Sequence, residues 1–469
     1  MKYDDIYFLN TKEALRVATE QNISEESNNL QICYYEGEKI ESDLINLIHL
    51  PLDTIVSSLE NGILRLPTRV SSAGFDISLN EWKAMEGGFL NLLEEAKKLR
   101  SKRNQNYFIK SRTNNPNFND KLRFYISAHS NTRVMQYSSK NIAQTLEHMG
   151  YEVYFDLYHG CEDFNCLKNI AEFNPHATIN INHVQTDFLN ENVFSFTWIQ
   201  DHWATSYLME NPKLRDRDIL FHIIEHYGDM LKRKSIKSFY QPFCINSKIF
   251  KLRDEIKREN KIVFIGSSYK DSYDDIENEN KEVICKECYN LYLNNGYIDS
   301  KERAKLQAKY SIKNIDLGHI LNYIDRDLAL EYIVNMDLSY DIEVYGYGWD
   351  QNKKLDGYFK GPVEYGENLS KIYNSAKYCL VIGGYILQQR TFESAASGSI
   401  PLVFDSRKGK ANLNNKDINK SLLFFKTLDD LKISLEQKEN VDLSIIIKKS
   451  NFDIFGKRII SIIEDKTKL

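Results

Sequence analysis

Arg390 and Glu393 are the two residues whose types and spacing most directly suggest chemistry. They open a helical segment that follows Gly383-Gly384 at the end of an apolar run. A guanidinium at a helix start can bind two oxygens of a pyrophosphate, because it and the helix N-terminus are both positive. A carboxylate one turn further on can accept hydrogen bonds from both hydroxyls of a ribose. The alternative is a plain ion pair between the two side chains across one helical turn.

The candidates for proton transfer lie in the first half of the chain, each after a short apolar run. His129 follows one such run, and Asp201 and His202 follow another. A histidine or a carboxylate with a suitable pKa can take a proton from a hydroxyl near neutral pH. We therefore predict His129, Asp201 and His202 as the catalytic set, with His183 as a weaker candidate. The alternatives are a surface histidine for His129 and a helix cap for Asp201.

Other titratable residues are assigned no chemistry. His222 and His226 are four residues apart and are interpreted as surface residues. Cys285-x-x-Cys288 is the only CxxC in the sequence, and a structural zinc site would need a second pair at matching spacing. No Asp-x-Asp motif stands at the end of a predicted strand. We therefore expect reduced, inert cysteines and no essential metal.

Alternating strand and helix patterns must position these residues. In the first half, apolar runs predict strands over 122–128, 151–155, 177–182 and 194–199, with helices over 134–149 and 163–173. In the second half the predicted strands are 261–265, 341–345, 378–382 and 400–404. The predicted helices are 276–336, 367–376, 391–396 and 441–465. We expect the first of these helices to break near Gly296 and Gly318, and the last to break near Asn451. Alternation at this spacing predicts parallel sheets that are covered by helices.

The domain organisation follows from these patterns. Helix-period apolar residues over 42–59 and 79–103 predict a mainly helical extension over residues 1–118. We predict a Rossmann-like acceptor-side domain over 119–245, a Rossmann-like donor domain over 246–440, and a C-terminal helix over 441–469 that packs back on the first domain. Such domains bind ligands at the carboxyl ends of their strands. The predicted fold class is therefore α/β, with two Rossmann-like domains facing across a cleft.

The order of motifs resembles the GT-B glycosyltransferases and is most similar to the family 4-like group that includes the CgeB spore-maturation proteins. The matching stretches are Val344–Trp349, Gly361–Lys377 and Arg390–Pro401, joined in the first half by Phe173–Ala177, Thr197–Asp201 and Cys244–Phe250. The resemblance covers residues 121–466. It implies metal-independent transfer of a sugar from a nucleotide-sugar donor, such as a UDP-, GDP- or dTDP-sugar, to an acceptor hydroxyl, without a cofactor.

The resemblance also implies roles for individual residues. Glu393 would hold the ribose, and Arg390 would face the pyrophosphate with Ser267 or Lys270 assisting. Many retaining relatives place a second glutamate eight residues before Glu393, where this sequence has Tyr385, so the sugar contact and the stereochemical outcome stay open. Pro362 and Val363 would lie along the nucleotide base, and Gly384 and Tyr385 would lie near the sugar. The predicted donor-binding set consists of these four residues together with Gly266, Ser267, Lys270, Gly346, Arg390, Thr391 and Glu393.

Composition narrows the partners and the compartment. The chain of 469 residues has 61 basic and 66 acidic residues, a net charge of −5, so we expect no nucleic acid as main partner. No apolar run approaches the roughly 18 residues of a membrane span, and the first residues lack a charged-then-apolar signal. We expect a cytoplasmic protein. Lys448-Lys449 and Lys457-Arg458 could touch an anionic membrane surface, although a solvated helix face is the simpler interpretation.

Two other functions fit the same fold. A nucleotide-sugar epimerase of the non-hydrolysing kind would need carboxylates around the sugar, and Tyr385 argues against that. A non-catalytic module that binds sugar nucleotides or another protein is disfavoured by Arg390 and Glu393 but stays open. The acceptor, whether protein, polysaccharide or lipid, is not determined by the sequence.

Overall fold

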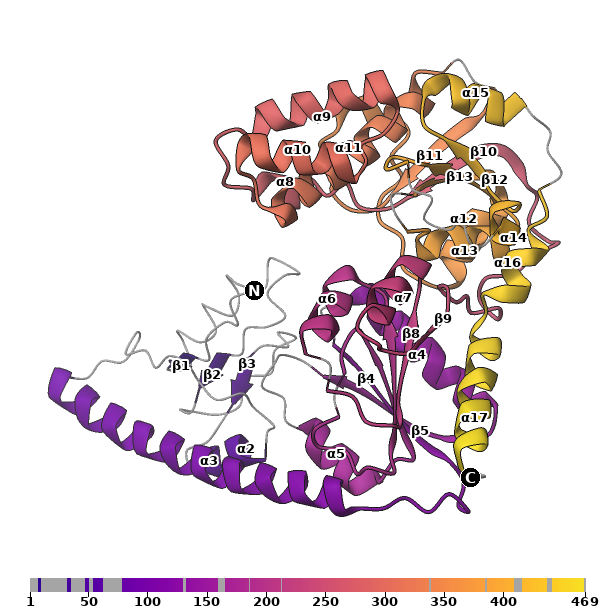
Figure 1. Cartoon of the computed structure of the whole chain (residues 1–469). Coiled ribbons are helices and arrows are strands. Elements are labelled where there is room, and N and C mark those ends of the chain that lie inside the picture. Colours follow the sequence, from indigo (N-terminus) through magenta and orange to yellow (C-terminus); the bar gives the residue numbers. More distant parts are fainter. Residues whose placement is uncertain are drawn as a thin grey trace. The chain divides into compact units, whose positions relative to one another are not determined.

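The structure is a computed structural model, and it is shown in Figure 1. It describes residues 7–9, 32–34, 47–49, 54–61, 78–129, 132–158, 165–184, 186–211, 213–336, 339–383, 386–408, 416–436 and 441–467. The chain divides into two compact units, which are residues 1–204 with 211–220 and residues 205–210 with 221–469.

The N-terminal residues combine short strands with two helices. Strands β1 (Tyr7–Leu9), β2 (Ile32–Tyr34) and β3 (Leu47–His49) form a parallel sheet, and α2 (Ile55–Glu60) packs against the long helix α3 (Leu79–Thr113). The predicted helix over 42–59 is confirmed only at its end, where α2 begins at Ile55, and is wrong at residues 47–49, which form β3. Pro51 stands between them in the sequence, and proline disfavours a continuous helix. The prediction of a mainly helical extension therefore missed a sheet.

The first large sheet has the strand order β5-β4-β6-β7-β8-β9. Its strands are β4 (Arg123–His129), β5 (Glu152–Tyr158), β6 (Ala177–Ile181), β7 (Phe194–Ile199), β8 (Asp218–His222) and β9 (Ser238–Tyr240). The helices are α4 (Arg133–His148), α5 (Asn165–Phe173), α6 (His202–Glu210) and α7 (Glu225–Lys232). Every residue of β6 and β7 is buried, as in parallel sheets that are covered on both faces.

The second large sheet is parallel throughout and has the order β11-β10-β12-β13-β14. Its strands are β10 (Glu259–Ile265), β11 (Asp341–Tyr345), β12 (Ala376–Ile382), β13 (Ile400–Phe404) and β14 (Leu423–Phe425). Both large sheets thus place their first strand between the second and the third. This order creates a crevice at the carboxyl ends of the first and third strands, where the connections leave in opposite directions.

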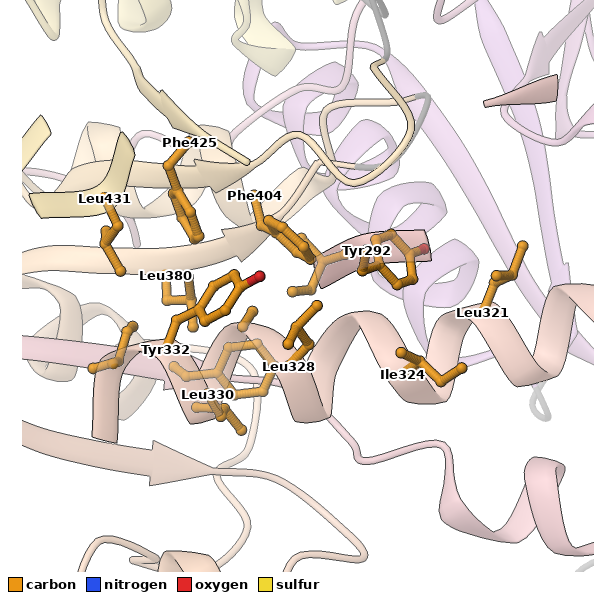
Figure 2. Packing of buried hydrophobic residues seen from close by; sticks show 14 of the residues in the cluster. Tyr292, Leu321, Ile324, Leu328, Leu330, Tyr332, Leu380, Phe404, Phe425 and Leu431 are labelled. Atoms are coloured by element: carbon orange, nitrogen blue, oxygen red, sulfur yellow. The ribbon is translucent and has the colours of Figure 1, made fainter. Parts of the chain in front are cut away.

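Helices cover the second sheet on both faces. Ile262 and Phe264 of β10 belong to one buried cluster, and Val263 and Ile265 belong to the other, because successive side chains of a strand alternate. Figure 2 shows the first cluster, in which Leu328 and Tyr332 of α11 pack beneath Phe404. The helices between β10 and β11 are α8 (Lys270–Asp274), α9 (Lys281–Asn295), α10 (Ser300–Tyr310) and α11 (Asn314–Val334), and those of the other face include α12 (Glu367–Ser375) and α13 (Gln389–Ala396).

The predicted break at Gly296 is confirmed, because this glycine ends α9 with a φ of 75°. The predicted break at Gly318 is wrong, since Gly318 lies inside α11. The chain turns instead at residues 311–313, where Ser311 takes a positive φ at the end of α10.

The C-terminal region contains α14 (Lys416–Asn419), α15 (Leu428–Glu436), α16 (Ser444–Lys449) and α17 (Phe452–Thr467). The predicted break near Asn451 is confirmed, as it separates α16 from α17. Phe455 packs edge-on against Phe221, with ring centroids 5.0 Å apart. Arg458 Nη1 donates to the Tyr240 carbonyl at 2.7 Å. Arg458 is therefore packed against β9 and does not belong to a solvated face. In the described part of the chain, no helix has the length and apolar character of a membrane span.

Candidate functional site

The loops that follow β10 and β11 lie against each other at the carboxyl edge of the second sheet. The Gly266 N–H donates to the Tyr345 carbonyl at 2.9 Å. Gly346 has a φ of +134°, and a Cβ there would lie 2.1 Å from the Gly266 oxygen. Only glycine tolerates both conditions. The predicted strand-end glycines 266 and 346 therefore allow two backbones to meet at this edge.

Arg390 of α13 reaches the same edge. Its Nη1 lies 3.2 Å from the position of a Cβ on Gly266, so the missing side chain leaves room for the guanidinium. Among the residues that the structure describes, Arg390 has no hydrogen-bond or ion-pair partner. Within the described residues, no acceptor competes with a ligand for the donors of this guanidinium at the crevice of β10 and β12.

Glu393 lies one turn further along α13 and is 3% exposed. Gln389 Nε2 donates to Glu393 Oε1 at 2.8 Å. Burial raises the pKa of Glu393 to about 7, although the charge of Arg390 and the hydrogen bond from Gln389 act in the opposite direction. The alternative of a helix-start ion pair is wrong, because within the described chain Arg390 and Glu393 have no N–O contact within 4.0 Å.

A second arginine near this edge, Arg326 of α11, was not predicted from the sequence. It is 6% exposed, its guanidinium lies 4.0 Å from the centre of the Tyr269 ring, and Nη1 donates to the Asn322 carbonyl at 2.8 Å. Its Nε is buried and has no hydrogen-bond partner in the described chain. Burial lowers the pKa of Arg326, and the charges of Arg390 and Arg407 act in the same direction, whereas Tyr269 and Asp325 raise it in part. Arg390 and Arg326 would both gain from a shared anion.

A third arginine is neutralised within the protein. Arg407 Nη2 lies 2.8 Å from Asp325 Oδ2, and Ser406 Oγ donates to the same oxygen at 3.0 Å. The pair is buried, so it orients the segment after β13 without adding net charge. The sequence signal for Arg326 was the charged triplet Asp325-Arg326-Asp327, which interrupts an otherwise apolar helical stretch.

The remaining predicted donor-side residues differ in their surroundings. Lys270 pairs with Asp274 one turn further along α8, so its ammonium already has an anionic partner. Thr391 is fully buried. Gly384 and Tyr385 lie outside the described residues. Ser267 follows β10 in the loop beside Gly346, and Pro362 and Val363 follow Gly361, whose carbonyl accepts from the Gly346 N–H at 3.1 Å.

A small cavity occupies the equivalent crevice of the first sheet, at the ends of β4 and β6. His129 and His183 line it, and Ser127 Oγ donates to Asn180 Oδ1 at 2.8 Å between the two strands. The cavity measures about 40 Å³, which suffices for a few water molecules. The structure therefore places His129, a predicted catalytic residue, and His183, the weaker candidate, at the same small cavity.

Asp201 follows β7 beside this crevice. Asn182 Nδ2 donates to Asp201 Oδ2 at 2.7 Å, while Asn182 Oδ1 accepts from the backbone N–H groups of Gln200 and Asp201. Burial raises the pKa of Asp201, and hydrogen bonds from Trp203 and Asn182 lower it in part. Asn182 was not predicted as a site residue. Its backbone has a positive φ of 63°. The carboxylate is thus held in place and keeps further acceptor positions.

The other histidines separate clearly. His202, a predicted catalytic residue, is the exposed first residue of α6. His226 is exposed on α7, which confirms its interpretation as a surface residue. The surface interpretation of His222 is wrong. It is 4% exposed, its Nδ1 lies 3.0 Å from Ser238 Oγ, and burial lowers its pKa to about 4. Gly228 makes the burial possible, because a Cβ there would lie 2.6 Å from His222 Nε2.

The paired cysteines lie one turn apart on α9. Burial raises the pKa of both Cys285 and Cys288, the latter to about 12, so neither favours the thiolate form that binds metals. Within the described residues, no group of three or more histidine, cysteine, aspartate or glutamate side chains is arranged to hold a metal ion.

Comparisons with known proteins add a likeness of fold. No family model and no curated protein matches the chain. A solved glycosyltransferase involved in avilamycin A biosynthesis, AviGT4, is 8% identical over 73% of this chain and 97% of its own, with a TM-score of 0.42. MurG of Acinetobacter baumannii is 8% identical over 74% and 100%, with a TM-score of 0.38. The UDP-GlcNAc 2-epimerase of Methanocaldococcus jannaschii is 10% identical over 73% and 99%, with a TM-score of 0.36. At these values the matches bear on neither reaction nor substrate.

Proposed function

We propose that the chain is a metal-independent glycosyltransferase of the GT-B type, which transfers a sugar from a nucleoside-diphosphate sugar to an acceptor hydroxyl. One observation carries the donor half of this proposal. Within the described chain Arg390 and Arg326 have no ion-pair contact, their charges disfavour each other, and Arg390 lies close enough to the buried Glu393 to influence its pKa. A diphosphate supplies the two negative charges, and its ribose supplies hydroxyl donors for Glu393.

The chemistry follows from the charges. As the bond between sugar and nucleotide breaks, negative charge develops on the leaving diphosphate. Fixed guanidinium groups at a largely buried edge stabilise that charge without reorganisation. On the other domain, Asp201 is the base that we assign to the acceptor hydroxyl, with His129 and His202 as the alternatives. The raised pKa of Asp201 supports this order, because a base works best when its pKa approaches the working pH.

The donor site is tested by isothermal titration with UDP, GDP, dTDP and UMP. We expect at least one nucleoside diphosphate to bind, the monophosphate to bind at least tenfold more weakly, and Arg390→Gln to weaken diphosphate binding at least tenfold. Arg233→Gln is the matched control, because Arg233 is exposed at the end of α7. Failure of every diphosphate to bind would rule out the proposal. Release of diphosphate during turnover separates transfer from epimerisation, which interconverts nucleotide sugars without release.

The metal-independent character is a separate proposal, and it is supported by the arginines. In many phosphate sites a divalent cation neutralises the diphosphate, and here Arg390 and Arg326 do so. We expect dialysis against EDTA to leave the rate of diphosphate release within about twofold of the untreated rate. A loss of activity that Mg²⁺ or Mn²⁺ restores would contradict this proposal.

We also propose the narrower CgeB-like affiliation and a cytoplasmic location. The motifs at 344–349 and 390–401 support the first. Free thiols at Cys166, Cys244, Cys285, Cys288 and Cys379 support the second, since thiols persist in a reducing compartment. The cleft between the two predicted domains stays a prediction.

A further inference from the structure

Trp203 presents a large aromatic surface beside the candidate base. It is the second residue of α6 and is 48% exposed. Its indole N–H donates to the Asp201 side chain. Its ring centroid lies 5.2 Å from that of His183, with the planes tilted by 57°. The ring is thus oriented by contacts on its edge and on one side, yet much of it stays open to solvent.

An indole that is both oriented and exposed forms a surface on which a flat ligand can stack. A tryptophan that only stabilises the fold is normally buried, as Trp198 of β7 is at 1% exposure. A hydrogen bond to Asp201 and a ring contact with His183 orient Trp203, so little conformational entropy is lost when a flat ligand stacks on it. Tyr207, one turn further along α6, is 57% exposed and extends the aromatic character of this helix.

We propose that the acceptor is a saccharide and that one of its pyranose rings stacks on the exposed surface of Trp203. This inference rests on the proposed glycosyltransferase function and names its acceptor class. A pyranose has a face of C–H groups that packs on an aromatic ring, and it carries hydroxyls around its edge. The Asp201 carboxylate lies at the edge of the indole, within reach of the N–H. A sugar stacked on the indole therefore directs an edge hydroxyl toward that carboxylate.

The surroundings favour a saccharide over a lipid chain. Three polar residues contact Trp203 or precede it in the chain, namely Asp201, His202 and His183. A lipid chain would need a continuous apolar surface, whereas a sugar needs an apolar platform with polar groups at its rim. The small cavity between β4 and β6 is lined by His183, which also contacts Trp203, so the cavity lies next to the proposed platform. The cavity can accept a single substituent or the waters around it.

The test is saturation-transfer NMR on the full chain, with UDP present and the pyranosides offered one at a time. The probes are methyl glucoside, methyl galactoside, methyl mannoside, N-acetylglucosamine, maltose and cellobiose, with dodecyl phosphocholine as the lipid comparison. We expect transfer to the ring C–H protons of at least one saccharide. Trp203→Ala should weaken that binding at least tenfold, and Trp203→Phe should keep it within about threefold because a phenyl ring still stacks. Leu90→Ala is the control, since Leu90 is a similarly exposed apolar residue on α3.

Three results would overturn the inference. They are the absence of transfer to every saccharide, saccharide binding that survives Trp203→Ala, and transfer to the lipid probe alone. Binding of UDP in the same samples separates this inference from the proposed function. If UDP binds and no saccharide does, the acceptor class is wrong and the donor site stands. If a saccharide binds through Trp203 and no nucleoside diphosphate binds, the saccharide platform stands and the transferase proposal fails.

Discussion

Three side chains dominate the electrostatics at the carboxyl edge of the second sheet. Arg390 and Arg326 repel each other, and Glu393 is desolvated to the point that burial raises its pKa to about 7. A single ligand, a diphosphate joined to a ribose, would offset both the repulsion between the arginines and the desolvation of the Glu393 carboxylate. Residues that are unfavourable to the empty protein and favourable to a complex are typical of binding sites.

Glu393→Gln separates the stability of the protein from its ligand binding. In the folded protein Glu393 holds its proton up to about pH 7, whereas in the unfolded chain it loses the proton near 4.5. The folded state is therefore destabilised as pH rises from 4.5 through 7, by up to about 3 kcal/mol. We expect the variant to be more stable than the parent at pH 8 and nearly equal to it at pH 4.5. Urea unfolding across this range measures the difference, and an equal difference at both pH values would contradict the assignment.

The same variant should bind the donor more weakly. At pH 8 the parent carboxylate can accept from both ribose hydroxyls, and the amide of glutamine has one acceptor oxygen. We expect at least a tenfold loss of affinity for the best-binding nucleotide sugar. Below pH 7 the parent should lose affinity as well, because Glu393 becomes protonated. A nucleotide sugar suits the measurement, since its diphosphate carries no titrating terminal phosphate.

Arg326→Met is expected to trade binding for stability. Methionine is apolar and flexible enough to fill the space under Tyr269, and it removes a buried charge. Without nucleotide, we expect a melting temperature equal to or a few degrees above that of the parent. Affinity for the preferred nucleoside diphosphate should fall at least tenfold. Differential scanning fluorimetry with and without nucleotide tests both claims, and a lower melting temperature with unchanged affinity would assign Arg326 a purely structural role.

The elements of the two large sheets explain why the site was partly predictable. Strands such as β7 and β13 are rich in apolar residues and are followed by polar turn residues, so their boundaries follow from the sequence. Arg390 and Glu393 were found because they directly follow such a strand. Arg326 was missed because its role depends on Tyr269, far away in the chain. Residues 202–240 gave no clear periodicity, so α6, α7, β8 and β9 were missed.

Gly346→Ala tests the contact between the loops that follow β10 and β11. A methyl group at this position would collide with the Gly266 carbonyl and require a rare backbone conformation. Gly357→Ala is the matched control, because Gly357 also has a positive φ, of +88°, but has open space around its Cβ position. We expect the control to lose about 1 kcal/mol of unfolding free energy and Gly346→Ala to lose several times more, together with nucleotide binding. Equal losses for the two variants would show that the close approach is unimportant.

At the scale of the whole molecule, each large sheet has its own crevice and its own part of the proposed reaction. Hydrogen exchange with and without nucleoside diphosphate should therefore show a local response. We expect increased protection in peptides that cover residues 266–270, 320–330 and 389–396, because binding orders only the groups that contact the ligand. Peptides that cover residues 123–158 should change much less. Equal protection in both regions would contradict a donor site confined to the second sheet.

The packing of α17 also has a consequence during protein synthesis. Arg458 contacts Tyr240 across 218 residues of chain and lies over the rings of Phe221 and Phe239. At roughly 5–20 residues per second, a ribosome needs about 10–40 s to make the intervening chain. Throughout that interval the rings of Phe221 and Phe239 lack the cover that α17 later gives them. Chaperones that recognise such surfaces should therefore engage the nascent chain until its last helix has left the ribosome.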